Sequence, residues 1–378
     1  MKILYILENM DGKDGWSTYG LSLIDEVMAL GMEVRIISSK NSKKSNEKSS
    51  FLYFLKPPKD YLLNIFNCFS ASRKIRVVIE EFNPDIIHFV VEPYSNILLF
   101  LRRNKKEKYI LTVHGTYSYI PELFDNPIKK IVSALICGVV FNSIDKIIAV
   151  SNFTSNYLKS KAPYLRDKII VIKNGIKINK NARTVKQEGG VKKITYIGAV
   201  KPRKGLYEAV EALGIFKQNS NTPFIFNIIG SYHGGDSYYE KILNKIKINK
   251  LEENIKFLGR VSDEEKNSLL SDSDLFIMTS INNGKDFEGF GLVYLEANSF
   301  GVPCIGPNDS GAVDAIMEGV SGFVVNPRNS REICDKVDFI INKKAIKRED
   351  CVDWAKKNDI KNRILETVEV YKDINNNN

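Results

Sequence analysis

The stretch EGFGLVYLE, residues 288–296, places two glutamates eight positions apart around a Gly-Phe-Gly turn. The apolar residues after the turn predict a helix, and Glu296 falls in its early turns. Such a turn exposes backbone N–H groups at a helix N-terminus, which is a natural binding site for an anion. A second interpretation stays open at this point, because acidic residues also favour a helix N-terminus without binding any ligand.

Short apolar runs on both sides of this stretch predict buried parallel strands. In the second half of the chain they fall at 193–198, 224–230, 255–259, 274–280, 303–306 and 322–325. An earlier series falls at 2–7, 33–38, 85–90, 109–113, 146–150 and 169–173, with helical patterns such as 18–30 between several of them. Two successive β-α series predict an α/β protein with two doubly wound, Rossmann-like domains, in which ligands bind beyond the carboxyl ends of the strands. We expect the two domains to face each other across a cleft.

The domain boundary is predicted at NKNARTVKQEGG, residues 179–190, which is polar and lacks an apolar period. We therefore expect a first domain at 1–178, a linker at 179–190 and a second domain at 191–350. Residues 351–378 are expected to form a helix that returns toward the N-terminal domain, and the final DINNNN is expected to be disordered. The length of 378 residues suits two domains.

Further motifs occur in a fixed order along the chain. They are a glycine loop before the first helix, HG at 114–115, AVSNFT at 149–154, VIKNG at 171–175, GAVKPRKG at 198–205, EGFGLVYLE, GVPCIG at 301–306 and GFVVNP at 322–327. In this order they resemble the retaining glycosyltransferases of family 4, which have the GT-B fold, and the resemblance covers nearly the whole chain. It implies transfer of a sugar from a nucleotide diphosphate donor bound by the second domain, with the acceptor on the side of the first.

The resemblance implies a role for each matching residue of the second domain. Glu288 corresponds to a glutamate near the transferred sugar and the reacting centre, and Glu296 to one that binds the ribose hydroxyls. Lys204 corresponds to a lysine that contacts the diphosphate, where a fixed cation would stabilise the charge that develops on the leaving phosphate. The other residues expected to bind the donor are Arg203, Val261, Phe290, Gly291 and Leu292.

In the first domain, His114 ends a predicted strand beside a glycine and matches a histidine that contacts the transferred sugar. Gly15 takes the place of the second glycine in the family's Gly-Gly loop, which lets the backbone approach a phosphate and an acceptor closely. Asp14 replaces the first glycine. His88 lies inside an apolar strand pattern and is interpreted as a core residue. The expected catalytic residues are His114, Glu288 and Lys204.

Two features depart from a simple match to the family. Ala199 stands where the family usually has an arginine after the strand-ending glycine, so either Arg203 or Lys201 substitutes, or the donor is held differently, or activity is reduced. Asp272 and Asp274 resemble the DxD metal signature of the other glycosyltransferase fold. Because they precede a predicted strand, we interpret them as a helix cap and the start of that strand, and we expect no metal and no other cofactor.

Charge and cysteine content limit the expected partners. The net charge is +10, and residues 1–180 carry all of it, with 27 Lys and Arg against 17 Asp and Glu. The basic runs at 40–48 and 102–108 fit either solvated surface or attraction to an anionic membrane. No nucleic-acid-binding pattern accompanies them. Five scattered cysteines and the lack of a long apolar run predict a cytoplasmic protein without a transmembrane helix, peripheral on the membrane if its acceptor lies there.

Three other functions are alternatives to sugar transfer. A nonhydrolysing nucleotide-sugar epimerase has a similar two-domain fold, but the 288–296 block argues against it. A sugar-nucleotide-binding partner subunit without activity stays open because of Ala199. A dinucleotide oxidoreductase would need GxGxxG after the first strand, where the chain reads ENMDGKDGW at 8–16. In the glycosyltransferase family that the chain resembles, UDP is the commonest donor nucleotide, with GDP or ADP as alternatives. The basic first half of the chain fits a glycan or a lipid-linked, lipopolysaccharide-type acceptor.

Overall fold

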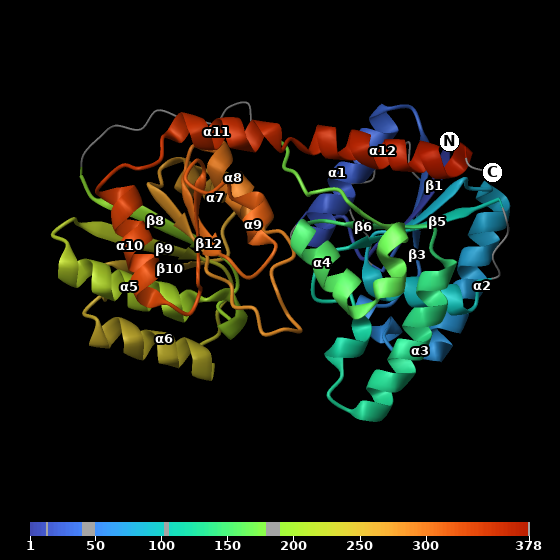
Figure 1. Ribbon diagram of the computed structural model, residues 1–378, viewed down its shortest axis with the longest axis horizontal. Coiled ribbons are helices and arrows are strands. Elements are labelled where there is room, and N and C mark those ends of the chain that lie inside the picture. The colour runs from blue at the N-terminus through green and yellow to red at the C-terminus, as the bar shows by residue number, and fades with distance from the viewer. Residues whose placement is uncertain (13, 40–49, 102–105, 179–189, 377–378) are drawn as a thin grey trace. The chain divides into compact units, whose positions relative to one another are not determined.

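The computed structural model describes residues 1–12, 14–39, 50–101, 106–178 and 190–376 (Figure 1). The chain divides into two compact units, an N-terminal unit of Met1–Asn174 with Ile360–Asn378 and a C-terminal unit of Gly175–Asp359. The linker expected at 179–190 lies outside the described residues, except for Gly190. The basic run at 40–48 and residues 102–105 of the second basic run also lie outside them.

A seven-stranded parallel sheet forms the centre of the N-terminal unit, in the order β3-β2-β1-β4-β5-β6-β7. The strands are β1 (Lys2–Ile6), β2 (Glu33–Ser38), β3 (Ser50–Tyr53), β4 (Ile86–Phe89), β5 (Lys108–Val113), β6 (Lys146–Ala149) and β7 (Ile169–Val171). The strand order reverses between β1 and β4, which pair with Ile3 opposite Ile86. Ligands of open α/β sheets bind at the carboxyl ends of the strands beside such a switch point.

Right-handed crossovers determine which helices cover which face of this sheet. The crossover from β1 to β2 runs along the sheet in the direction opposite to the crossovers that follow β3, so its helix α1 (Gly15–Ala29) lies on one face. The later crossovers place α2 (Ile65–Phe82), the 3₁₀ helix η2 (Glu92–Leu99), α3 (Pro127–Ser143) and α4 (Asn152–Lys161) on the other face. Short 3₁₀ helices occur at η1 (Pro58–Tyr61), η3 (Ile120–Leu123) and η4 (Pro163–Lys168). In Figure 1, α3 lies below the sheet of this unit, and α2 lies at its right-hand side.

The C-terminal unit has a six-stranded parallel sheet in the order β10-β9-β8-β11-β12-β13. Its strands are β8 (Lys192–Ile197), β9 (Phe224–Ile229), β10 (Ile255–Gly259), β11 (Leu275–Ile277), β12 (Cys304–Pro307) and β13 (Gly322–Val325). Its helices are η5 (Pro202–Lys204), α5 (Leu206–Asn219), α6 (Ser237–Ile248), α7 (Asp263–Ser271), α8 (Leu292–Ser299), α9 (Ala312–Ala315), α10 (Ser330–Ile341) and α11 (Arg348–Lys357). The strand order reverses between β8 and β11, so the loops that follow these two strands are neighbours.

The predicted α/β architecture with two doubly wound parallel sheets is confirmed, and all twelve predicted strands are present. β3 was not predicted, because this four-residue edge strand is too short to give a clear alternation. All five cysteines are buried and form no disulfide. Among the described residues no helix is long and apolar enough to cross a membrane.

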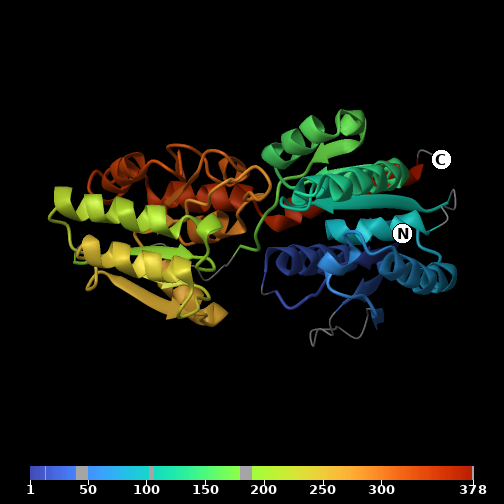
Figure 2. The same cartoon turned by 90° about the horizontal axis from the view of Figure 1, so that it is seen from below.

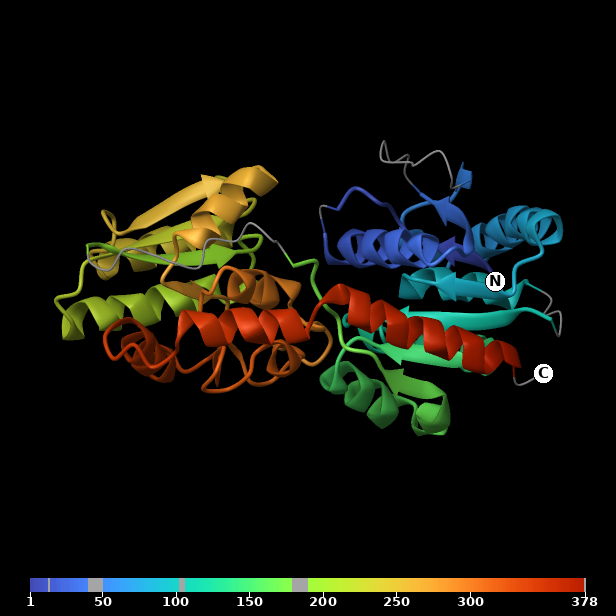
Figure 3. The ribbon, with the colours of Figure 1, turned by 90° about the horizontal axis from the view of Figure 1, so that it is seen from above.

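The C-terminal segment differs from the single helix expected at 351–378. It consists of α11, which ends at Lys357, and α12 (Ile360–Asn376), and the break between them falls where the two units divide. The Trp354 indole N–H of α11 donates to the Ala315 carbonyl of the C-terminal unit at 2.8 Å. α12 packs on α1 of the N-terminal unit (Figure 3) and continues into most of the tail that was expected to be disordered.

A buried polar chain fastens α12 to the N-terminal sheet. His88 is fully buried in β4, as expected of a core residue. Its Nδ1 lies 2.5 Å from the Tyr371 hydroxyl of α12, and its Nε2 lies 2.7 Å from Thr112 Oγ1 of β5. Burial lowers the pKa of His88 to about 3, so the ring is neutral near pH 7 and can donate to one hydroxyl while it accepts from the other. The sheet and α12 therefore share one satisfied hydrogen-bond chain.

Gly205 marks the point where the loops after β8 and β11 come closest. Its φ is +67°, and a Cβ atom there would lie 1.8 Å from the Thr279 carbonyl oxygen. The Thr279 hydroxyl donates to the Gly205 carbonyl at 3.1 Å, and the Ile281 N–H donates to the Arg203 carbonyl at 2.7 Å. These contacts hold the two loops of the switch point against each other.

We expect Gly205→Ala to lower the free energy of unfolding by at least about 1–2 kcal/mol, the cost of a side chain in the left-handed region, with overlap against Thr279 adding to it. Gly138→Ala, within α3, is the matched control, because a Cβ there meets nothing within 4 Å. Alanine at a helical position should be neutral or stabilising. Urea denaturation compares the two variants, and equal losses of stability would contradict the tight loop contact.

Candidate functional site

Two loops at the switch point of the C-terminal sheet carry the charged residues that the sequence singles out. Arg203 and Lys204 belong to η5, in the loop that follows β8. Glu288 lies in the loop between β11 and α8. Since β8 and β11 are neighbouring parallel strands, both loops leave the sheet at its carboxyl edge.

Glu288 and the two cations form one cluster. The Lys204 ammonium lies 2.6 Å from Glu288 Oε2, the Arg203 guanidinium lies 3.8 Å from the same oxygen, and the Ser280 hydroxyl donates to it at 3.3 Å. Only 16% of the Glu288 side chain is exposed. Burial by itself would raise the pKa of this carboxyl, but Lys204 and Arg203 outweigh it and hold the pKa below its ordinary value. The cluster therefore stays ionised and carries one more positive than negative charge.

The turn that follows Glu288 leads directly into α8. Gly291 precedes the helix with a φ of +84°, and a Cβ there would lie 2.4 Å from the Tyr294 ring and 3.5 Å from Glu288 Cγ. Gly291 gives α8 no side-chain cap, so its first-turn N–H groups are not satisfied in that way. Leu292 begins the helix and Phe290 is buried. Together with two nearby cations, this helix N-terminus offers an environment for an anion.

Glu296 makes a different contact from the one at Glu288. Its carboxylate pairs with the Lys266 ammonium of α7 at 3.2 Å, and Lys266 also lies 3.4 Å from Asp263. Val261 lies half-buried in the turn before α7, next to the N-cap residue Ser262. Lys266 was not predicted as a site residue, because a single lysine inside an ordinary helix gives no signal before its partner on α8 is placed.

His114 lies at the carboxyl end of β5 in the N-terminal unit. Its Nε2 lies 2.9 Å from the Val90 carbonyl oxygen, and its ring packs edge-on against Tyr19 at 5.0 Å between centroids. Burial lowers the pKa of His114 to about 4, so the ring is neutral near pH 7. A carbonyl oxygen can only accept, so Nε2 carries the proton and Nδ1 keeps a lone pair for a hydroxyl donor.

Glu92 is a buried carboxyl beside His114 that the sequence analysis missed. Its Oε1 accepts the His114 backbone N–H at 2.6 Å, and its Oε2 is buried without a hydrogen-bond partner. Burial raises the pKa of Glu92 to about 7, although the N–H groups of His114 and Gly115 act in the opposite direction. The signal was an acidic residue two positions after the apolar run 85–90, at the carboxyl end of a strand next to the switch point.

Gly15 begins α1, and Asp14 takes the N-cap position. The Asp14 carboxylate accepts the Ser17 N–H at 2.9 Å, and the Ser17 hydroxyl accepts the Asp14 N–H at 3.3 Å, which completes a capping box. The negatively charged side chain of Asp14 therefore lies at this helix N-terminus, at the position where the family that the chain resembles has a glycine. Any ligand phosphate near Gly15 would meet that carboxylate.

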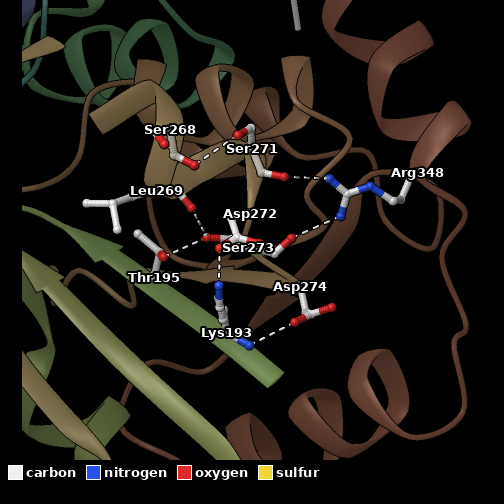
Figure 4. A network of polar contacts seen from close by, with 9 residues as sticks. All are labelled: Lys193, Thr195, Ser268, Leu269, Ser271, Asp272, Ser273, Asp274 and Arg348. Atoms are coloured by element: carbon white, nitrogen blue, oxygen red, sulfur yellow. Dashed lines mark hydrogen bonds and ion pairs between the residues drawn. The ribbon is translucent and has the colours of Figure 1, made fainter. Parts of the chain in front are cut away.

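Asp272 and Asp274 lie at the amino end of β11, beside Lys193 of β8 (Figure 4). This is the edge of the sheet opposite to the loop that carries Glu288. Asp274 accepts the Lys193 N–H of β8 at 2.7 Å, and Asp272 contacts the Lys193 ammonium. Asp85 accepts the Lys2 N–H and Asp145 accepts the Tyr109 N–H in the same manner, each at 2.8 Å.

In all three cases an aspartate directly before a strand binds the backbone of the neighbouring strand. Asp272 and Asp274 therefore hold the amino end of β11 against Lys193 of the neighbouring strand β8. In the part of the chain that the structure describes, no group of three or more His, Cys, Asp or Glu residues is placed to hold a metal ion.

Ala199 lies in the loop after β8, and its carbonyl accepts the Tyr196 hydroxyl at 3.2 Å. Of the two residues considered as substitutes for the missing arginine, Arg203 lies against Glu288, whereas Lys201 is exposed. The structure thus brings together Arg203, Lys204, Glu288 and Gly291 at one edge of the C-terminal sheet. Val261 and Glu296 flank α7 in the same unit, and His114 and Gly15 belong to the N-terminal unit.

We expect Glu92→Gln to become more stable relative to the parent as the pH rises. In the folded parent Glu92 keeps its proton up to about pH 7, whereas the unfolded chain releases it near the ordinary pKa of 4.5. The unfolding free energy of the parent therefore falls across this window, by an amount on the order of 3 kcal/mol. His88 and His114 act in the opposite direction below pH 6.5, but they are present in both proteins and cancel in the difference.

Urea denaturation at pH 5 and pH 8 measures this difference, with Glu80→Gln on the exposed face of α2 as the control. A stability difference between Glu92→Gln and the parent that is the same at both pH values would show that Glu92 is not buried as a neutral acid.

Comparison with known proteins places the chain in a family. The model described as "Glycosyltransferase Family 4" matches residues 14–180, and the model described as "Glycosyl transferases group 1" matches residues 177–358. The two matches together span all but the ends of the chain and meet near the boundary between the two units.

Relatives agree with this assignment. An uncharacterized glycosyltransferase of Methanocaldococcus jannaschii is 25% identical over 314 residues, 82% of this chain and 80% of the relative. An uncharacterized 41.2 kDa protein in the cps region of Klebsiella pneumoniae is 28% identical over 329 residues, 81% of this chain and 84% of the relative. The structure of Anabaena HepE in complex with UDP and glucose superposes with a TM-score of 0.73 at 18% identity, over 98% of this chain and 99% of that one. Solved structures of this kind show a GT-B fold, and the chain belongs to the group 1 glycosyltransferases of family 4.

Proposed function

We propose that this glycosyltransferase moves a sugar from a nucleotide diphosphate sugar, with UDP as the nucleotide, to a glycan or lipid-linked acceptor, with retention of anomeric configuration. One observation carries the proposal: Lys204 and Arg203 face Glu288 across the switch point, beside the N-terminus of α8 that lacks a side-chain cap. The net positive charge and the N–H groups suit the diphosphate, and the carboxylate suits sugar hydroxyls.

In this proposal the donor diphosphate competes with Glu288 for Lys204. The bond between the anomeric carbon and the phosphate oxygen breaks while the acceptor hydroxyl forms its new bond on the same face, and the acceptor proton passes to the departing phosphate. Lys204, Arg203 and the first-turn N–H groups of α8 stabilise the negative charge on the leaving group. Glu288, released from part of its ion pair, accepts hydrogen bonds from the sugar.

The remaining donor contacts follow the same reasoning. Glu296, paired with Lys266 in the free protein, is assigned to the ribose hydroxyls, and Val261 to the base side of the donor. His114 is assigned to a sugar hydroxyl, because its neutral ring keeps Nδ1 as an acceptor. Gly15 is assigned to close backbone approach by the substrates, with the Asp14 carboxylate directing that contact to hydroxyls rather than to phosphate.

The choice of donor and acceptor class draws on the relatives. UDP and glucose are bound by HepE in its solved structure, and the Klebsiella relative is placed in a cps region by its description. The excess of basic residues in 1–180 suits an acceptor that carries or accompanies negative charge. We therefore assign the reaction to synthesis of a cell-surface polysaccharide or glycoconjugate.

Transfer is proposed to need no divalent metal. The positive charge at the leaving group comes from Lys204 and Arg203, whereas Asp272 and Asp274 lie at the opposite edge of the sheet and bind Lys193. Activity should therefore survive EDTA, and complete loss that Mn²⁺ or Mg²⁺ restores would contradict this part of the proposal.

Ala199 supports a second candidate function, a nucleotide-sugar-binding subunit with little or no activity of its own. The two functions differ in an assay with purified protein, because the second predicts stabilisation by UDP without sugar transfer. Ligand at 100 times its dissociation constant raises the unfolding free energy by about 2.7 kcal/mol, which a thermal-shift panel of nucleotide sugars detects.

We expect Lys204→Ala to lower turnover about 100-fold or more while donor affinity falls far less, because the lysine charge matters most as the diphosphate leaves. Lys201→Ala is the matched control, an exposed lysine of the same loop. Steady-state kinetics with the donor found in the panel separates kcat from KM. Unchanged turnover in Lys204→Ala would assign the leaving-group charge elsewhere, with Arg203 next to be tested. As a companion change, Ala199→Arg should raise turnover if the site is otherwise intact.

A further inference from the structure

Glu92 holds the backbone of His114 at the point where β5 ends. β5 stops at Val113, so the His114 N–H lies past the strand pairing and donates to Glu92 Oε1 at 2.6 Å. Directly after His114, Gly115 turns the chain away from the sheet with a φ of +144°, and its N–H donates to the Ser118 hydroxyl oxygen at 3.1 Å. The position of His114 therefore depends on a side-chain carboxylate rather than on the sheet.

The element that carries Glu92 is buried and closely packed. Glu92 begins η2 and is only 2% exposed, and Pro93 restricts the backbone next to it. The Ser95 hydroxyl donates to the Glu92 carbonyl at 2.8 Å. η2 packs against both α2 and α3 and lies between them (Figure 2). Such rigid support is what a residue needs in order to position another one.

The second carboxylate oxygen of Glu92 can carry a proton without disturbing the first. Oε2 is buried and has no hydrogen-bond partner in the described part of the chain. Buried polar atoms are nearly always hydrogen-bonded, so an exception calls for a reason. A proton that binds Glu92 takes this oxygen, because Oε1 accepts the His114 N–H. The acid and the carboxylate therefore both fit the site with Oε1 in the same place.

Ionisation of Glu92 changes the strength of its bond to His114. Hydrogen bonds to an ionised acceptor are shorter and roughly twice as strong as those to a neutral one. Burial raises the pKa of Glu92 to about 7, so this change falls in the range of physiological pH. Burial thus makes the charge costly for folding, whereas the same charge tightens the hold on the His114 backbone.

The titratable groups on the elements around Glu92 stay neutral across this range. Burial lowers the pKa of His114 to about 4 and that of His88 on β4 to about 3. The pKa of Glu92 itself responds to burial and to the backbone N–H groups of His114, Glu92 and Gly115, and no charged side chain among the described residues contributes. Burial also raises the pKa values of the tyrosines and cysteines on α1, α2, α3, η1 and η2, which are Tyr19, Cys68, Cys137, Tyr61 and Tyr94.

We propose that Glu92 is a positioning residue for sugar transfer, which acts through the His114 backbone to hold the ring where Nδ1 meets a substrate hydroxyl, and which holds it most firmly when ionised. Val90 and Tyr19 already contact the ring itself, so Glu92 restrains the remaining freedom, which is that of the backbone. The inference rests on the proposed function, because it takes the role of His114 from there. Its consequence is that transfer becomes faster as Glu92 loses its proton.

The test is the pH profile of kcat/KM between pH 5.5 and 8.5 in the parent and in Glu92→Gln. Glutamine keeps the size of the side chain and an oxygen for the His114 N–H, but it cannot ionise. The parent should rise about fivefold, the difference between hydrogen bonds to a charged and to a neutral acceptor, with a midpoint near the Glu92 pKa of about 7. The variant should equal the parent at pH 5.5 and be about fivefold slower at pH 8.5. Glu80→Gln, on the exposed face of α2, is the control and should keep the profile of the parent.

A merely structural role of Glu92 would give a different pattern. The stability of Glu92→Gln relative to the parent should rise with pH, so activity that followed stability would rise with it. Positioning predicts the opposite trend, in which the variant becomes relatively more stable and relatively slower. A kcat/KM ratio between the two proteins that stays constant with pH would overturn the proposal.

His114→Ala separates this inference from the proposed function. Unchanged transfer by His114→Ala would contradict the role assigned to His114, and the inference with it. A large loss in His114→Ala, with a Glu92→Gln profile that still rises like that of the parent, would overturn the inference alone.

Amide hydrogen exchange of the parent tests the hold on His114 without a variant and without turnover. After correction for the intrinsic exchange rate, protection in residues 113–118 should increase about fivefold from pH 6 to pH 8, as the bond to Glu92 strengthens. Protection that stays constant or falls over this range would overturn the proposal, whether or not the protein transfers sugar.

Discussion

The ionised carboxylate of Glu288 is the feature on which the proposed donor site depends. It is largely buried, and it stays charged because Lys204 and Arg203 reach it from the neighbouring loop. That approach requires β8 and β11 to be adjacent, the strand order to reverse between them, and the two loops to touch at Gly205 and Thr279. The sheet topology thus places two cations and a helix N-terminus at one point, which is the combination that a diphosphate needs.

The N-terminal unit arranges buried polar groups around the carboxyl ends of β4 and β5. His114 is held by Val90 and by Glu92, and Tyr19 of α1 packs on its ring. The Thr112 hydroxyl of β5 lies within 3.5 Å of the Tyr19 hydroxyl and contacts His88, which in turn contacts α12. Both rings are neutral because burial lowers their pKa values, so this region offers hydrogen-bond acceptors and donors rather than charge. The two units therefore differ in the chemistry they offer, since the charges of the C-terminal cluster suit phosphate and the neutral rings of the N-terminal unit suit hydroxyls.

Much of this could be predicted from the sequence, for identifiable physical reasons. Buried parallel strands are continuous apolar runs, so the strands at 2–7 and 193–198 were readily found, whereas the four-residue edge strand β3 was not. Lys204 and Glu288 were identified because their motifs match a family, but their ion pair depends on the strand order, which no local pattern encodes. Glu92 and Lys266 were missed because the partners that define them lie far away in the sequence. The start of β11 at Asp274 was interpreted correctly, and the same use of Asp85 and Asp145 shows that the pattern repeats.

We propose that the donor diphosphate binds between the loop after β8 and the N-terminus of α8. Amide hydrogen exchange with and without UDP tests it most directly, because the backbone N–H groups themselves are proposed as ligands. We expect slower exchange in residues 202–206 and 288–294 on adding UDP, and no change at the amino end of β11 around Asp272 and Asp274. If UDP protected other parts of the chain but left exchange in residues 202–206 and 288–294 unaltered, the proposed binding place would be contradicted.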